Sequence, residues 1–70
     1  MSAATEPKFP QVEVNIMSVD GNAFSIMGAV SKAMRREGIP YEDIEAFKKE
    51  CMAGDYDHLL QTCMRTVTVA

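Results

Sequence analysis

The sequence predicts a small, single-domain α+β protein with the element order β-α-α-α-β. Apolar residues alternate with polar ones near the start of the chain and again at its end, which is typical of strands. Three segments between these repeat apolar residues every three or four positions, as helices do. Gly, Pro and Asp residues separate the segments. We therefore expect two terminal strands to pair in a small sheet that is packed by helices.

The first expected strand follows a polar N-terminal segment. Residues 1–10 are predicted to form a flexible arm, and residues 11–70 the folded domain. A strand is predicted over residues 11–16, where β-branched residues recur at every second position, with a possible extension to 17–19. The apolar residues of this strand are Val12, Val14 and Ile16.

The first helix is predicted over residues 23–37, after an N-cap at Asp20 or Asn22, with Gly21 free to take a positive φ. Gly38 is expected to end the helix as a C-cap. The small residue Gly28 interrupts the helix and is interpreted as a place of close helix packing. The face expected to be buried consists of Phe24, Ile26, Met27, Ala29, Val30, Ala33 and Met34.

Two further helices and a strand complete the pattern. Residues 41–52 form the second predicted helix, and the third begins at Asp55 or Asp57, either of which can cap it. Alternating β-branched residues predict a second strand over 66–69. The expected buried residues of the two helices are Tyr41, Ile44, Phe47, Cys51 and Met52, then Leu59, Leu60, Cys63 and Met64.

The two strands come from opposite ends of the chain, and the sequence leaves their relative direction open. A two-stranded sheet is marginal alone and has two unpaired edges. Helices that cover one face would stabilise it, and so would a homodimer with a continuous four-stranded sheet. A monomer and a homodimer therefore both remain open at this point.

Composition narrows the class of protein. The 70 residues include ten acidic and seven basic ones, for a net charge of -3, so nucleic acid is not the expected partner. No apolar window approaches the length of a membrane span, and no signal peptide is visible, so we expect a cytoplasmic protein with no membrane partner. Cys51 and Cys63 are then expected to be buried free thiols. The six Met residues suit either a small core or an adaptable contact surface.

The turn before the first helix is a candidate anion-binding site. A strand that leads through a Gly-containing turn into a helix presents free backbone N–H groups, here those of Gly21, Asn22 and Ala23. One glycine is not a phosphate-binding motif, and no Walker lysine and serine follow. Helix capping by Asp20 or Asn22 explains the same residues without a ligand.

A second polar segment surrounds the only histidine, with Asp55, Tyr56 and Asp57 directly before His58. An aspartate could orient the histidine as a base, but no nucleophile with matching spacing is present. The spacing of Cys51, His58 and Cys63 matches no zinc pattern. We predict no catalytic residues, no metal and no cofactor, and interpret the segment as a helix start at the surface.

Residues 21–28 (GNAFSIMG) and 54–60 (GDYDHLL) together resemble short uncharacterised proteins of bacteria and their phages. In those proteins a strand precedes the Gly-Asn-Ala-Phe helix start, and a Gly-Asp-Tyr-Asp segment opens the last helix. The resemblance covers about residues 11–69. It implies a small accessory protein and assigns no activity, substrate or partner.

The first functional hypothesis is a non-enzymatic module that binds an unidentified protein partner through a sheet edge or an apolar helical surface. The alternative is a small-ligand or anion binder at the turn of residues 20–22. A third, nucleic-acid binding through Lys32, Arg35 and Arg36, conflicts with the acidic balance. The candidate interaction residues are Val12, Val14, Val67 and Val69 at the sheet, and Asp55, Tyr56, Asp57 and His58 at the third helix.

Overall fold

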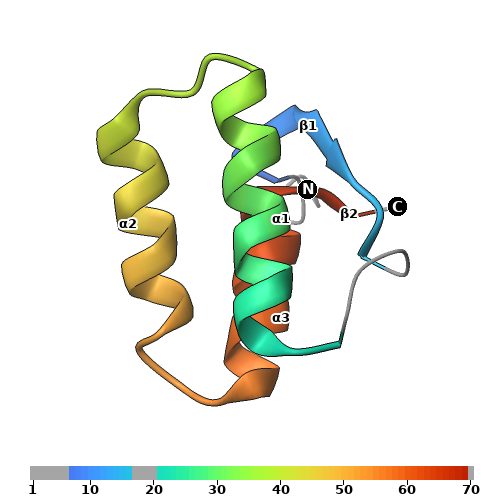
Figure 1. Cartoon of the computed structure of the whole chain (residues 1–70), viewed down its shortest axis with the longest axis vertical. Helices are drawn as coiled ribbons and strands as arrows, with labels where there is room; N and C mark the ends of the chain where they lie inside the picture. Colours follow the sequence, from blue (N-terminus) through green and yellow to red (C-terminus); the bar gives the residue numbers. More distant parts are fainter. Residues whose placement is uncertain (1–6, 17–20, 70) are drawn as a thin grey trace, which may run out of the picture.

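The computed structural model describes residues 7–16 and 21–69. It confirms the predicted α+β class and the order β-α-α-α-β. Helices α1 and α3 each contact a strand on one side and α2 on the other, so they form a layer between the sheet and α2 (Figure 1). The elements are β1 (Phe9–Val14), α1 (Ala23–Arg36), α2 (Tyr41–Cys51), α3 (Tyr56–Thr66) and β2 (Val67–Val69).

The two strands pair with each other in parallel, with Phe9 opposite Val67 and Val14 opposite Val69. The pairing is irregular between Phe9 and Glu13, where Pro10 has no N–H to donate. The carbonyl oxygen of Pro10 instead accepts a hydrogen bond of 2.8 Å from the Thr68 hydroxyl. This pairing closes the domain by joining its first element to its last.

The strand boundaries differ from the predicted ones. β1 begins at Phe9, inside the expected arm of residues 1–10, because Val67, the first residue of β2, provides a partner for it. The predicted extension over residues 17–19 lies outside the described residues. Thr66 ends α3 rather than starting β2, because its hydroxyl donates to the Thr62 carbonyl at 2.7 Å as part of the helix.

A single apolar core lies between the sheet and the three helices. One face of each predicted helix is buried as the periodicity requires, and every second residue of β1 from Val12 points inward. Both cysteines are buried free thiols, as predicted. The core consists of Val12, Val14, Ile26, Met27, Val30, Met34, Ile44, Phe47, Cys51, Leu59, Cys63 and Val67.

Four residues predicted to be buried are exposed, and all lie at a helix end or off the core face. Tyr41 begins α2, and Met52 follows its last turn as the C-cap, so neither has a neighbouring element to cover it. Phe24, in the first turn of α1, is 72% exposed. Met64 is displaced by about 100° around α3 from the buried Cys63, which turns it to solvent.

Local signals define the helix ends. Asn22 caps α1, because its side chain accepts hydrogen bonds from the N–H groups of Phe24 and Ser25. Asp55 caps α3 by accepting from the N–H of His58 at 2.9 Å. Gly38 ends α1, as predicted, with a φ of 80°.

Gly28 does not mark close packing, contrary to the sequence interpretation. It is exposed, and a methyl group at this position would meet nothing within 4 Å. Gly54 is the glycine that packing requires, because a methyl carbon there would lie 2.8 Å from the Cβ of His58. That Cβ is fixed to the backbone of α3 and has little freedom to move away.

These two glycines provide a matched test of the packing. Gly28→Ala should raise the free energy of unfolding by about 0.5–1 kcal/mol, since alanine restricts the unfolded chain and suits a helix interior. Gly54→Ala should lower it by about 1–3 kcal/mol through steric overlap with His58. Urea unfolding followed by circular dichroism measures both. Equal effects at the two sites would contradict the close approach of Gly54 to α3.

Candidate functional site

Three large apolar side chains surround a hollow at one end of the helical layer. The start of α1, the end of α2 and the start of α3 meet at this end (Figure 1). Phe24, Met52 and Tyr56, here called the apolar rim, are 72%, 63% and 45% exposed. The hollow has a volume of about 270 Å³. Its lining residues are Ala23, Phe24, Met27, Cys51, Met52, Gly54, Asp55, Tyr56 and Leu59.

The floor of the hollow is apolar and closed. Met27, Cys51 and Leu59 are buried, with exposed fractions of 9%, 2% and 3%. Each comes from a different helix, so the floor is part of the core that holds α1, α2 and α3 together. An exposed apolar rim over a buried apolar floor is a surface on which a further apolar group loses contact with water at little cost.

A hydrogen bond between distant segments orders the rim. The hydroxyl of Tyr56 donates to the carbonyl oxygen of Gly21 at 2.7 Å. This bond joins the turn before α1 to the first residue of α3, so the two segments that sequence analysis singled out lie side by side. Phe24 is placed by the Asn22 cap, which fixes where α1 begins.

The structure places the predicted anion-binding residues in this same corner. Gly21 and Asn22 are exposed and Ala23 is half-buried. The Asn22 side-chain oxygen lies 2.8 Å from the N of Phe24 and 3.3 Å from the N of Ser25, so it already accepts from two N–H groups of the helix start. The geometry therefore favours the capping role of this turn, and anion binding stays a prediction.

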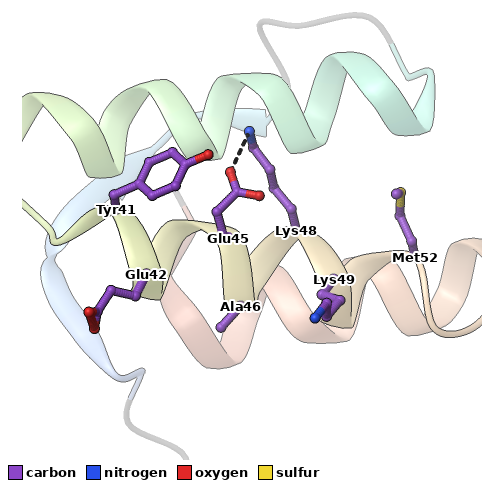
Figure 2. Close-up of a pocket in the computed structure, with 7 residues that line it drawn as sticks. All are labelled: Tyr41, Glu42, Glu45, Ala46, Lys48, Lys49 and Met52. Atoms are coloured by element: carbon purple, nitrogen blue, oxygen red, sulfur yellow. Dashed lines mark hydrogen bonds and ion pairs between the residues drawn. The ribbon is translucent and has the colours of Figure 1, made fainter.

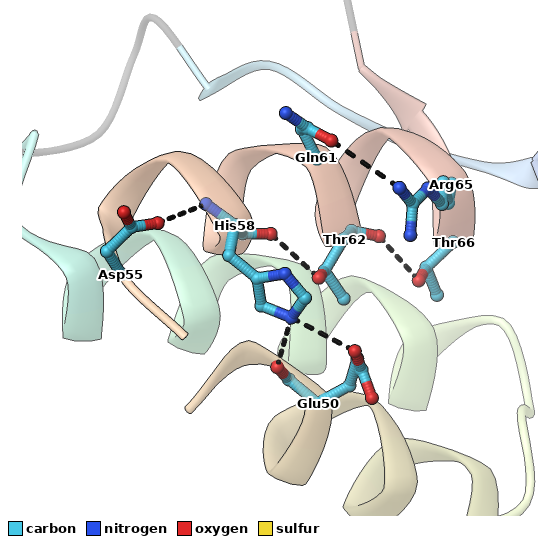
Figure 3. Close-up of polar contacts among 7 residues, drawn as sticks. All are labelled: Glu50, Asp55, His58, Gln61, Thr62, Arg65 and Thr66. Carbon is cyan, nitrogen blue, oxygen red and sulfur yellow. Dashed lines mark hydrogen bonds and ion pairs between the residues drawn. The ribbon is translucent and has the colours of Figure 1, made fainter. Parts of the chain in front are cut away.

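His58 connects the start of α3 to the end of α2. Its Nε2 lies 3.0 Å from the Glu50 backbone oxygen and 3.0 Å from Glu50 Oε2, while its backbone N–H donates to Asp55 (Figure 3). The Thr62 hydroxyl donates to the His58 carbonyl one turn later. These contacts hold the α2–α3 turn, and with it Met52 and Tyr56, in place.

Of the four predicted interaction residues at α3, Tyr56 belongs to the apolar rim and Asp55 lines the hollow. Asp57 is exposed next to them and accepts a hydrogen bond from Gln61 at 3.0 Å. His58 is a positioning residue for the turn. The structure thus brings the predicted segment to the hollow, but Phe24 and Met52, which sequence analysis assigned to the core, complete the surface.

The predicted sheet residues do not form a side-chain surface. Val12, Val14 and Val67 are buried against the helices, and Val69 is half-buried. The sheet has the order β1-β2 with no further described strand. The outer edge of each strand therefore has no strand partner among the described residues. Binding at this sheet would therefore depend on backbone hydrogen bonds.

A second, wider hollow of about 640 Å³ lies along α2 (Figure 2). Its lining side chains spread outward from the helix, and Lys48 pairs with Glu45 at 3.3 Å across one turn. Such exposed pairs contribute about 0.3–0.5 kcal/mol, so this is ordinary solvated helix surface. Met52, which also belongs to the apolar rim, and Tyr41 are its exposed apolar members.

The two thiols lie directly beneath the site. The hydrogen bond with Cys63, together with burial and the nearby charge of Glu50, raises the pKa of Cys51 well above its ordinary value. Cys51 therefore stays a neutral, weakly nucleophilic thiol at neutral pH. It serves the hollow as part of the apolar floor.

This raised pKa predicts a loss of stability in alkali. Unfolded cysteine has a pKa of about 8.5, so above that pH the unfolded chain loses a proton that folded Cys51 keeps. Between pH 7.5 and 9.5 the free energy of unfolding should fall by at most about 1 kcal/mol, because the hydrogen bond with Cys51 lowers the pKa of Cys63 and offsets part of the Cys51 effect. Urea titration at the two pH values measures this fall. In Cys51→Ala, which is less stable at both pH values, this fall should be smaller. An equal fall in both proteins would show that Cys51 ionises freely in the folded state.

Comparisons with protein families, curated proteins and solved structures give no match for this chain. The resemblance to bacterial and phage proteins therefore stays a prediction. Within residues 7–16 and 21–69, no helix is both long enough and apolar enough to cross a membrane.

Proposed function

We propose that this protein is a small, non-enzymatic protein-interaction module that binds an apolar segment of a partner protein in the hollow between α1, α2 and α3. The observation that carries the proposal is the exposure of the apolar rim. Three large side chains stay in water around one concave, apolar surface, although the fold has a core in which apolar residues are buried. Exposed apolar surface of this kind is typical of interaction sites.

The size and chemistry of the hollow favour a protein partner over a small molecule. Pockets for small molecules measure roughly 300–1,000 Å³ and carry several converging polar groups. This hollow measures about 270 Å³, and among the described residues that line it only Asp55 is charged. A single apolar side chain inserted from a partner, with its backbone across Phe24 and Met52, fits such a site.

The residues of the apolar rim suit adaptable recognition. Met52 is flexible and polarisable and can follow the shape of an inserted group. Tyr56 is held by its bond to Gly21 and supplies a fixed aromatic surface. We place the module in a reducing cytoplasm, where Cys51 and Cys63 remain free thiols as they are here. The resemblance of segments 21–28 and 54–60 supports a bacterial or phage origin.

The outer edges of β1 and β2 support a second candidate, in which a partner or a second copy adds a strand to the sheet. β2 has only three residues, which limits the number of backbone hydrogen bonds at its edge. The hollow is therefore the preferred site, and the sheet edge is tested beside it.

Substitutions in the apolar rim should weaken partner binding while the protein stays folded. Phe24→Ser and Met52→Ser remove exposed apolar surface, so we expect at least a tenfold loss of captured partner, while unfolding free energy changes by about 0.5 kcal/mol or less. The measurement is affinity capture from nuclease-treated bacterial lysate with quantitative mass spectrometry. Tyr41→Ser and Met64→Ser are matched controls, because both residues are exposed and lie outside the hollow.

The same assay separates the two candidate surfaces. Val69→Pro changes the end of β2 and leaves the hollow intact. Capture that survives Phe24→Ser and Met52→Ser but disappears with Val69→Pro would overturn the hollow and favour strand addition.

A further inference from the structure

Acidic residues lie on the α3 side of the hollow, whereas the α1 side carries no charge. Residues 21–31, which include the first half of α1, carry no ionisable side chain. Residues 50–64 contain Glu50, Asp55 and Asp57 but neither Lys nor Arg. Of these acids, Asp55 lines the hollow, and Asp57 follows the rim residue Tyr56. A partner that enters the hollow therefore meets negative charge on the α3 side.

Asp55 and Asp57 can each accept a further hydrogen bond from a partner. Asp55 Oδ1 accepts from the His58 N–H, and Asp57 Oδ2 accepts from Gln61. The ion pairs among the described residues are those of Lys48 with Glu45 and of His58 with Glu50, so neither aspartate has a cationic partner there. Both residues are exposed, so their carboxylates are accessible to a partner.

Two lysines lie in the last turn of α2, outside the lining of the hollow. Lys49 is exposed one turn before Met52 on α2, and Lys48 lies beside it in its pair with Glu45. Because α2 as a whole carries more acidic than basic residues, the charges that distinguish the rim are those of Asp55 and Asp57 on the α3 side. Rim charges of this kind contribute mainly to orientation and specificity.

We infer that the occupant of the hollow is a peptide segment of a partner protein with an apolar side chain for the hollow and a neighbouring Lys or Arg over Asp55 and Asp57. This inference rests on the proposed function and adds the charge and orientation of the ligand. The apolar side chain contacts Phe24 and Met52. The cation pairs with the two aspartates, which also stabilise the N-terminus of α3.

The experiment is selection of random peptides displayed on phage against the immobilised full-length protein. Enriched peptides should share an apolar residue with Lys or Arg close by, and selection against Phe24→Ser should not enrich them. Selection against the double variant Asp55→Asn/Asp57→Asn should keep the apolar preference and lose the basic one. Asparagine caps helices as well as aspartate, so α3 keeps its start in this variant.

One enriched peptide, made synthetically, gives the affinity. Its binding should weaken roughly threefold to tenfold in Asp55→Asn/Asp57→Asn and by a similar factor when salt is raised, since each exposed ion pair contributes modestly. Glu42→Gln/Asp43→Asn is the matched control, because it removes the same charge at the distant start of α2. Its affinity should equal that of the unmodified protein.

Failure of the charge inference and failure of the proposed function give different results in this experiment. Enriched peptides that need Phe24 but show no basic residue, or bind the double aspartate variant equally well, would overturn the charge inference and leave the hollow as the site. Enrichment that is the same against Phe24→Ser would overturn the proposed function itself.

Discussion

The parallel pairing of β1 with β2 is the constraint on which the rest of the structure depends. Parallel neighbours cannot be joined by a tight turn, so the chain between them must cross the domain and return. Here the crossover consists of all three helices, and it leaves Phe9 opposite Val67. Because these residues are far apart in the sequence, their pairing carries a large loop-closure entropy. The packed helices offset that cost, so sheet and helical core form together.

The crossover also creates the candidate site. α1 and α3 both start at the end of the layer where α2 finishes (Figure 1). The ends of these helices extend past the core, so residues there such as Phe24 and Met52 are largely exposed. The Tyr56–Gly21 hydrogen bond and the His58–Glu50 contacts then hold these ends at a fixed separation. The hollow is thus a consequence of where three helices meet.

The periodicity of the sequence predicted most of the core but failed at the helix ends. Val30 and Met34 lie mid-helix, where a face that points inward is covered along its length, and both are buried as expected. Phe24 and Tyr41 satisfy the same spacing, yet they lie in first turns that extend past their neighbours. A pattern of apolar residues gives the direction of a side chain around the helix axis, and it does not say whether another element reaches that turn.

The sequence by itself determined the five elements, their order and the burial of both thiols, and it narrowed the N-caps of α1 and α3 to two residues each, because these depend on local propensity and on one-dimensional periodicity. Only the tertiary structure decided the parallel direction of the strands, the close contact of Gly54 with His58 and the open space at Gly28. It alone placed Phe24, Met52 and Tyr56 around one hollow. Each of these depends on the separation of segments distant along the chain, which packing sets and no local pattern encodes.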